Sequence, residues 1–142
     1  MEYRKFGSDY ILRIDLGEEV LTQIQELCVR ERITLGTVSG LGACGEATLG
    51  VFNRERFAYE TAHYTGDFEI ASCYGTVSTM DGKPYLHIHA AIANPVKGLL
   101  YGGHLNRAVV SLTGEFTVHA IAGTVEREYS PEVGLNLFQF TD

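Results

Sequence analysis

An Asp-Gly dipeptide between two alternating segments is the feature that most restricts how this chain can fold. Residues 68–78 and 84–93 are joined by Met80-Asp81-Gly82-Lys83. Asp-Gly favours the positive φ angles of a two-residue hairpin turn, whose twist matches that of the flanking strands. The two segments are therefore predicted to pair as antiparallel strands.

The hairpin turn also predicts the register of the two strands. With a two-residue loop, His87 lies opposite Thr76 and His89 lies opposite Tyr74. Because side chains alternate between faces, both histidines are expected to share one face with Phe68, Ile70, Ser72, Ala91 and Ala93. The other face is mainly apolar and is expected to pack on the core; it holds Glu69, Ala71, Cys73, Val77, Leu86, Ile88, Ala90 and Ile92.

One region has a helical period, at about residues 18–32. Its apolar residues recur at spacings of three and four, and Glu18 and Glu19 are expected in the first turn, where the helix dipole favours negative charge. The apolar residues are Val20, Leu21, Ile24, Leu27 and Cys28. Further strands are expected at 10–16, 37–43, 46–52, 57–64, 108–121, 124–129 and 135–140.

These patterns predict an α+β fold that is mainly an antiparallel β-sheet with one main amphipathic helix. The 142 residues suit a single domain over 1–142. Glycines at 36, 40, 42 and 45 match no dinucleotide or phosphate-binding loop, so they are interpreted as a turn or bulge.

The acidic balance of the chain argues against a generic nucleic-acid coat. The formal net charge is −7, and the sequence has no basic tail. The first residues lack the apolar stretch of a secretory signal and no window is long enough to span a membrane, so a soluble, cytoplasmic protein without membrane partners is expected. The cysteines, at 28, 44 and 73, form no C-x-x-C pair and are expected to be buried reduced thiols.

Three of the five histidines form a candidate metal site. His87 and His89 project from one side of a strand, and His104 follows two glycines that let a bend aim its side chain. Three neutral imidazoles suit Zn²⁺, with a fourth position left to water, a carboxylate or a small ligand. From the pattern alone, an equally good interpretation is that the strand histidines are partly buried and hydrogen-bonded. His63 and His119 have no comparable partners and are interpreted as structural.

Two carboxylates are weak candidates for a fourth ligand or a general acid or base. Glu69 is expected to face away from the histidine pair unless a bulge reverses the strand, and Glu115 is expected to face solvent. No Gly-x-Ser-x-Gly motif or evident Cys–His pair indicates hydrolytic chemistry.

The stretch from Gly66 to Leu105 resembles the plants-and-prokaryotes-conserved (PPC) domain, and the resemblance extends over almost the whole chain. The matching motifs are Gly66-Asp67-Phe68-Glu69-Ile70, Gly75-Thr76-Val77, Asp81-Gly82, His87-Ile88-His89-Ala90 and Gly103-His104-Leu105. The resemblance implies one main antiparallel sheet, assembly as a homotrimer, and membership of a group described as predicted DNA-binding proteins.

The same fold is similar to that of acetolactate decarboxylase, a zinc enzyme whose metal is held by histidines. That resemblance implies that His87, His89 and His104 are metal ligands, but a shared fold does not transfer a reaction. The chain departs from the family at Asp67, where Arg is usual, and at Ala108, where Gly is frequent, and it has no Arg-Gly-Arg-Pro hook for the DNA minor groove.

Three hypotheses follow. The first is a regulatory or interaction module, a homotrimer in which DNA contact would need Lys83, Lys97 and Arg107 from several subunits to gather on one face. The second is a zinc-dependent enzyme, a lyase or hydrolase, or a small-ligand binder that uses the three histidines. The third is a purely structural trimer whose strand edges are covered by neighbouring subunits.

Overall fold

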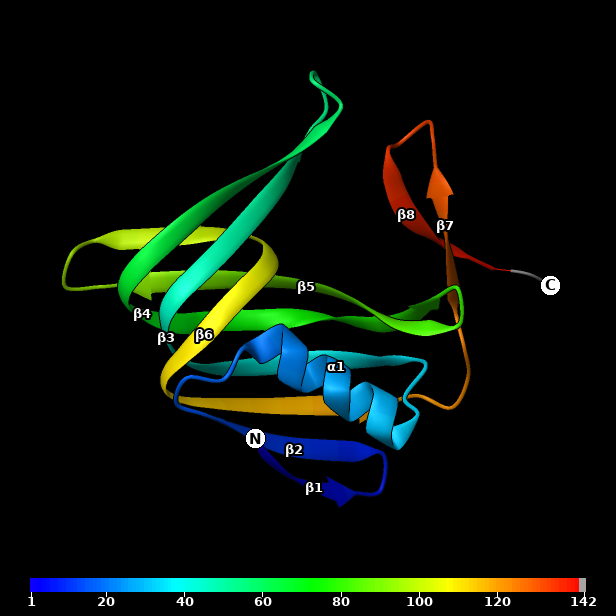
Figure 1. Cartoon of the computed structure of the whole chain (residues 1–142), viewed down its shortest axis with the longest axis horizontal. Coiled ribbons are helices and arrows are strands. Elements are labelled where there is room, and N and C mark those ends of the chain that lie inside the picture. The colour runs from blue at the N-terminus through cyan, green and yellow to red at the C-terminus, as the bar shows by residue number, and fades with distance from the viewer. Residues whose placement is uncertain (141–142) are drawn as a thin grey trace.

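The computed structural model describes residues 1–140 and has eight strands and one helix in that range (Figure 1). This confirms the predicted α+β class, mainly antiparallel with a single helix. The elements are β1 (Glu2–Phe6), β2 (Asp9–Asp15), α1 (Val20–Glu31), β3 (Gly36–Asn53), β4 (Ala58–Met80), β5 (Lys83–Asn94), β6 (Leu99–Ala120), β7 (Glu126–Ser130) and β8 (Leu135–Gln139).

The strands form one sheet in the order β1-β2-β6-β3-β4-β7-β8, and β5 pairs with both β4 and β6. The second pairing of β5 closes a ring through β3, β4, β5 and β6. All these pairings are antiparallel, whereas β7 joins β4 in parallel through Thr79 and Glu126. The outer halves of β3 and β4 continue together as a long hairpin that rises beside the β7–β8 hairpin (Figure 1).

The predicted hairpin register is confirmed between Ser72 and Lys83, with His87 opposite Thr76 and His89 opposite Tyr74. Beyond Ser72 a β-bulge shifts the pairing by one residue. The extra residue reverses the alternation of side chains. The predicted faces are therefore wrong at the start of this segment: Phe68 and Ile70 are buried, whereas Glu69 and Ala71 are exposed.

Several predicted strands are parts of longer ones. The segments 37–43 and 46–52 both belong to β3, and 57–64 and 68–78 both belong to β4. The glycine-rich stretch in β3 is a bulge, where Gly42 has a φ of 153°. β6 begins at Leu99 rather than at 108, so His104 lies on a strand and the predicted flexible bend is wrong. β1 was not predicted, and Leu16, expected in a half-buried strand, lies outside β2 and is exposed.

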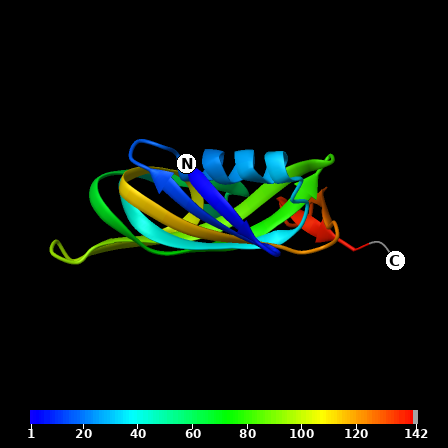
Figure 2. The ribbon, with the colours of Figure 1, turned by 90° about the horizontal axis from the view of Figure 1, so that it is seen from below.

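Helix α1 covers one face of the sheet (Figure 2). Four of the five predicted apolar residues, Val20, Ile24, Leu27 and Cys28, are buried, and Leu21 is partly buried. Glu19 is the N-cap rather than a first-turn residue, and its carboxylate accepts hydrogen bonds from the backbone N–H groups of Leu21 and Thr22. Such a cap satisfies donors that the first turn cannot pair internally. All three cysteines are buried and free, as predicted.

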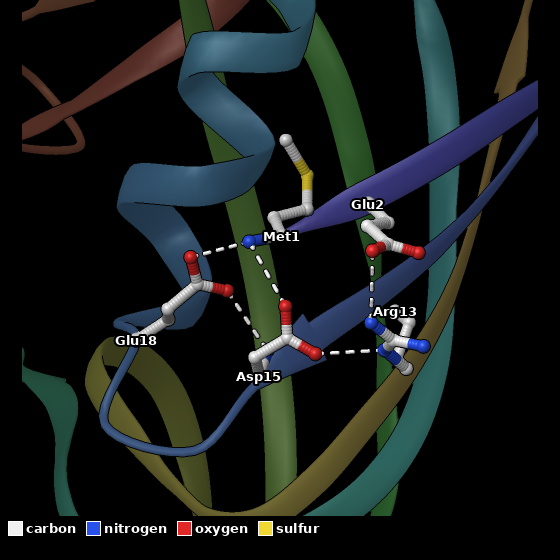
Figure 3. A network of polar contacts seen from close by, with 5 residues as sticks. All are labelled: Met1, Glu2, Arg13, Asp15 and Glu18. Carbon is white, nitrogen blue, oxygen red and sulfur yellow. Dashed lines mark hydrogen bonds and ion pairs between the residues drawn. The ribbon is translucent and has the colours of Figure 1, made fainter.

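A network of charges holds the start of the chain against the segment that leads into α1 (Figure 3). The amine of Met1 contacts Glu18 and lies 3.3 Å from Asp15. Asp15 also accepts from Arg13 at 2.7 Å, and Arg13 lies 3.3 Å from Glu2. Glu18 is thus an ion-pair partner of the amine rather than a first-turn residue, and hydrogen bonding to it raises the pKa of the amine.

Cross-strand pairing separates the two faces of the sheet. On the inner face, one row of cross-strand partners runs over β2, β6, β3, β4 and β5, and every member is buried. The row consists of Tyr10, Val118, Val38, Gly75 and Ile88. On the outer face the corresponding row is Ile11, Thr117, Ser39, Tyr74 and His89. The helix covers the inner face, whereas the outer face remains open in one chain. No helix in residues 1–140 is long and apolar enough to cross a membrane.

The packing of α1 predicts a large loss of stability for Ile24→Ala. Ile24 is fully buried, and deletion of a buried Ile side chain to Ala costs about 2–5 kcal/mol. The free energy of unfolding, measured by denaturant titration, is expected to fall by that amount. Val29→Ala on the exposed side of the same helix is the control and is expected to change it little. Equal effects of the two substitutions would contradict the assigned inner face of α1.

Candidate metal centre

Strand pairing brings together the three histidines that the sequence singled out. His89 on β5 lies directly opposite His104 on β6, and His87 lies two residues from His89 on the same side of β5. One ring nitrogen from each histidine lies within 4.8 Å of the others. The ring centroids are 4.2 Å apart for His89 and His104, 4.9 Å for His87 and His104, and 5.2 Å for His87 and His89.

The histidines share a polar contact even without an ion. His87 Nε2 and His104 Nδ1 are 3.1 Å apart, so one ring donates and the other accepts. Burial, reinforced by the charges of His104, Arg127 and His89, lowers the pKa of His87 to about 4. Burial and the neighbouring His89 also lower the pKa of His104. Both rings are therefore neutral near pH 7, which is the form that binds a metal.

The donor set fits a zinc ion. Two nitrogens bound at about 2.0–2.1 Å to a tetrahedral ion are roughly 3.4 Å apart, close to the observed separation of His87 Nε2 and His104 Nδ1. Three imidazoles are a common zinc ligand set that leaves one position open. Among residues 1–140, the cluster contains no carboxylate.

The other candidates lie outside the cluster. The bulge in β4 puts Glu69 opposite Ala93, on the histidine side of β5, so the predicted orientation of Glu69 is wrong, yet its carboxylate is not in the cluster. Glu115 is exposed, as predicted. His63 contacts Thr48 Oγ1 at 3.0 Å and His119 contacts Asp9 at 2.8 Å. These two contacts agree with the structural interpretation of both histidines.

A pocket of about 420 Å³ lies beside the histidine cluster and is lined in part by His87 and His104. Its walls come from β5 and β6, from the β3–β4 hairpin through Phe52 and Tyr59, and from the β7–β8 hairpin. Gly134 lies in the turn between β7 and β8, where its φ is 81° and an added Cβ would be 2.8 Å from the Cζ atoms of Phe52 and Phe57. A glycine is therefore needed for the two hairpins to approach closely.

Arg127 is the most important pocket residue that the sequence did not reveal. Only 8% of it is exposed; its Nε donates to Ser78 Oγ at 2.8 Å and its Nη1 donates to the carbonyl of Asn136 at 2.7 Å. Its guanidinium also lies over the ring of Tyr85, at 4.8 Å, and over that of Phe138, at 4.2 Å. In the sequence, Arg127 is one charged residue of a short alternating segment, and nothing in that pattern indicates burial.

The three basic residues considered for DNA contact do not gather within one chain. Lys83 and Lys97 lie at the two ends of β5, at its first residue and in the turn that follows it. Arg107 donates to Glu46 at 2.8 Å. Only an arrangement of several chains could therefore bring them onto one face.

A bent antiparallel sheet, one covering helix and a three-histidine cluster define a class of small α+β proteins with a candidate metal centre. The model of the Plants and Prokaryotes Conserved (PCC) domain matches residues 1–122, and this chain belongs to that family. Comparison with curated proteins gives no match.

Solved structures support the same assignment. A metal-containing protein from Archaeoglobus fulgidus is 32% identical, with a TM-score of 0.88, over 98% of this chain and 97% of that one. A PPC protein from Pyrococcus horikoshii is 30% identical, with a TM-score of 0.84, over 99% and 96%. A candidate DNA-binding protein from Bacteroides thetaiotaomicron is 32% identical, with a TM-score of 0.94, over 98% and 96%.

The lowered pKa of His87 predicts acid sensitivity of the metal-free protein. In the unfolded chain His87 takes up its proton near pH 6.5, whereas in the folded protein it does so near pH 4. The unfolded state therefore binds the extra proton across this window, and stability falls as the pH is lowered from 6.5 to 4. His87→Gln is expected to make that fall shallower in denaturant titrations of chelator-treated protein.

The exposed His63 supplies the control for this pH dependence. His63→Gln is expected to keep the steeper fall of the parent protein. If the three proteins lost stability equally between these two pH values, the assigned titration of His87 would be wrong.

Proposed function

We propose that this PPC-domain protein is a zinc-dependent small-ligand protein, with His87, His89 and His104 as the metal ligands. The observation that carries the proposal is the convergence of three ring nitrogens within 4.8 Å beside a pocket of about 420 Å³. The metal-containing relative from Archaeoglobus fulgidus gives independent support. When bound, zinc would supply a Lewis acid that polarises a carbonyl or acidifies a water molecule.

The protein's own residues prepare this site. The neutral imidazoles of His87 and His104 need not lose a proton before binding a cation. His89 is exposed in the single chain, so the cluster lies on the outer face of the sheet. A lyase or hydrolase reaction is compatible with this arrangement, but the pocket supports ligand binding more directly than it supports a particular reaction.

We also propose that the chain assembles as a homotrimer. The open outer face exposes large apolar side chains, among them Ile11, Leu41 and Tyr74, with 47%, 56% and 60% of their surfaces accessible. Burial of such side chains is a common driving force for association. The free edge of β1 offers a second surface that a neighbouring subunit could cover.

DNA binding is the second candidate function. It is favoured by the likeness to the candidate DNA-binding protein from Bacteroides thetaiotaomicron. The net charge of −7 opposes it, because phosphate contacts depend on local positive potential. A DNA-binding role would require the trimer to gather Lys83, Lys97 and Arg107 on one surface.

Zinc content tests the metal proposal. Protein purified without chelator or affinity tag is expected to hold about one zinc ion per chain by elemental analysis. His87→Ala and His104→Ala are expected to reduce the zinc content to near zero, because a structural or catalytic site needs at least three protein ligands. His63→Ala, outside the cluster, is the control and is expected to retain the metal. Equal, near-zero zinc in all four proteins would refute the site.

A salt titration tests the DNA proposal on the assembled protein, whose mass by light scattering is expected to be three times 15.6 kDa. If the protein contacts phosphates, the logarithm of the binding constant falls as the logarithm of the salt concentration rises, with a slope of about −0.9 per phosphate neutralised. Lys83→Ala removes one phosphate contact from each subunit that touches DNA. The slope is therefore expected to become shallower by about 0.9 for each of those subunits. Absent binding, or a flat response, would exclude DNA binding.

A further inference from the structure

The pocket beside the histidines has an unusual balance of charge. Among the described residues that line it, none is acidic, although the chain as a whole is strongly acidic. Arg127 is the one permanently charged side chain in the lining. An anion that enters this pocket therefore meets a fixed positive charge and no repelling carboxylate from the lining.

Arg127 is a buried cation whose charge is not neutralised within the described chain. It forms no ion pair with a carboxylate of residues 1–140. Its hydrogen bonds go to a hydroxyl and a carbonyl, and Nη2 has no hydrogen-bond partner among residues 1–140. Burial of an unpaired charge is costly. A ligand that brings a negative charge to Arg127 would offset that cost.

The position of Arg127 relative to the histidines follows from the strand. Tyr85, His87 and His89 are alternate residues of β5 and so lie on one side of it. The guanidinium of Arg127 lies over Tyr85, at 4.8 Å from the ring centroid. Alternate residues of a strand are about 6.6 Å apart, so Tyr85 and His87 are neighbours on this side of β5, and Arg127 and His87 line the same pocket.

The remaining walls combine apolar surface with neutral polar groups. Leu86, Leu135 and Leu137 are apolar, whereas Tyr59 donates from its hydroxyl to Asn106 Oδ1 at 2.9 Å. The volume of about 420 Å³ is within the usual range of small-ligand sites. A single fixed cation with apolar walls suits a monoanion with an apolar body better than a doubly charged phosphate.

We propose that this pocket binds a small organic carboxylate, with the carboxylate on Arg127 and the body of the ligand directed toward the histidine cluster. The carboxylate would accept hydrogen bonds from the free N–H groups of Arg127, the pairing for which a guanidinium is shaped. The contact between the carboxylate and Arg127 is independent of the proposed zinc site. Only the orientation of the other end of the ligand toward the histidines rests on the proposed function. Arg127 follows the residues that the family model matches, so the C-terminal hairpin supplies this specificity.

Benzoate is a suitable probe because it carries one carboxylate on a compact apolar body, and benzamide is its uncharged match. Calorimetric titration of the purified protein is expected to give binding of benzoate at least tenfold tighter than that of benzamide or inorganic phosphate. Arg127→Met is expected to weaken benzoate binding by about tenfold to a hundredfold, the size of a charge-assisted hydrogen-bond pair. Lys97→Met removes the same charge from the turn beyond β5 and is expected to leave binding unchanged.

Two further measurements separate the proposal from folding effects and from the metal. Arg127→Lys keeps the positive charge but loses the paired N–H groups of the guanidinium, and it is expected to bind benzoate with an intermediate affinity. Thermal unfolding and zinc content of each variant report whether its fold and its histidine cluster are intact. Chelator-treated protein, in which all three histidines are present, is expected to lose zinc but to keep benzoate binding that depends on Arg127. Absence of zinc from the untreated parent protein, with retention of this dependence, would refute only the metal site. Equal affinity for benzoate and benzamide, or tighter binding of phosphate, would overturn the carboxylate proposal.

Discussion

The backbone hydrogen bonds that join β5 to both β4 and β6 are the constraint on which the rest of this structure depends. Adjacent strands lie about 4.8 Å apart, so pairing alone brings His104 to His89 across a strand boundary. The pairing also closes the ring of β3 to β6, which keeps the histidines from moving apart as independent loops would. A metal centre built on paired strands needs little ordering when an ion binds.

The helix decides which side of that ring is available for chemistry. The apolar stripe of α1 buries the inner face, where Val38, Val118 and Ile88 pack. The alternation of side chains then puts His89 and Tyr74 on the opposite, open face. The hydrophobic core and the histidine cluster thus lie on opposite sides of the same strands.

The C-terminal hairpin changes what the histidine cluster can do. The family model ends at residue 122, before β7 and β8 begin. These strands add a wall to the pocket and bring Arg127 next to Tyr85. The protein carries a net charge of −7, but the pocket is positive because Arg127 lies in its wall and no acidic residue among 1–140 does. A charge a few ångströms from a ligand acts on it more strongly than distant surface charges, which salt screens. The net charge therefore argues against nucleic-acid binding but not against the binding of a small anion in this pocket.

Local patterns in the sequence were enough for the helix, for the hairpin register around Asp81-Gly82 and for the choice of His87, His89 and His104, because each depends on residues close together in the chain or on motifs shared with the family. The bulge after Ile70 was not predictable, since one extra residue leaves the composition of the strand unchanged while it reverses the faces. The strand that carries His104 was not predicted because it contains Gly102 and Gly103, and glycine is unfavourable in a strand unless a neighbouring backbone lies close, as Gly50 does beside Gly103. Arg127 became a pocket residue only through tertiary packing, because burial of a cation depends on partners such as Ser78 and Asn136 that lie elsewhere in the chain or on the next strand.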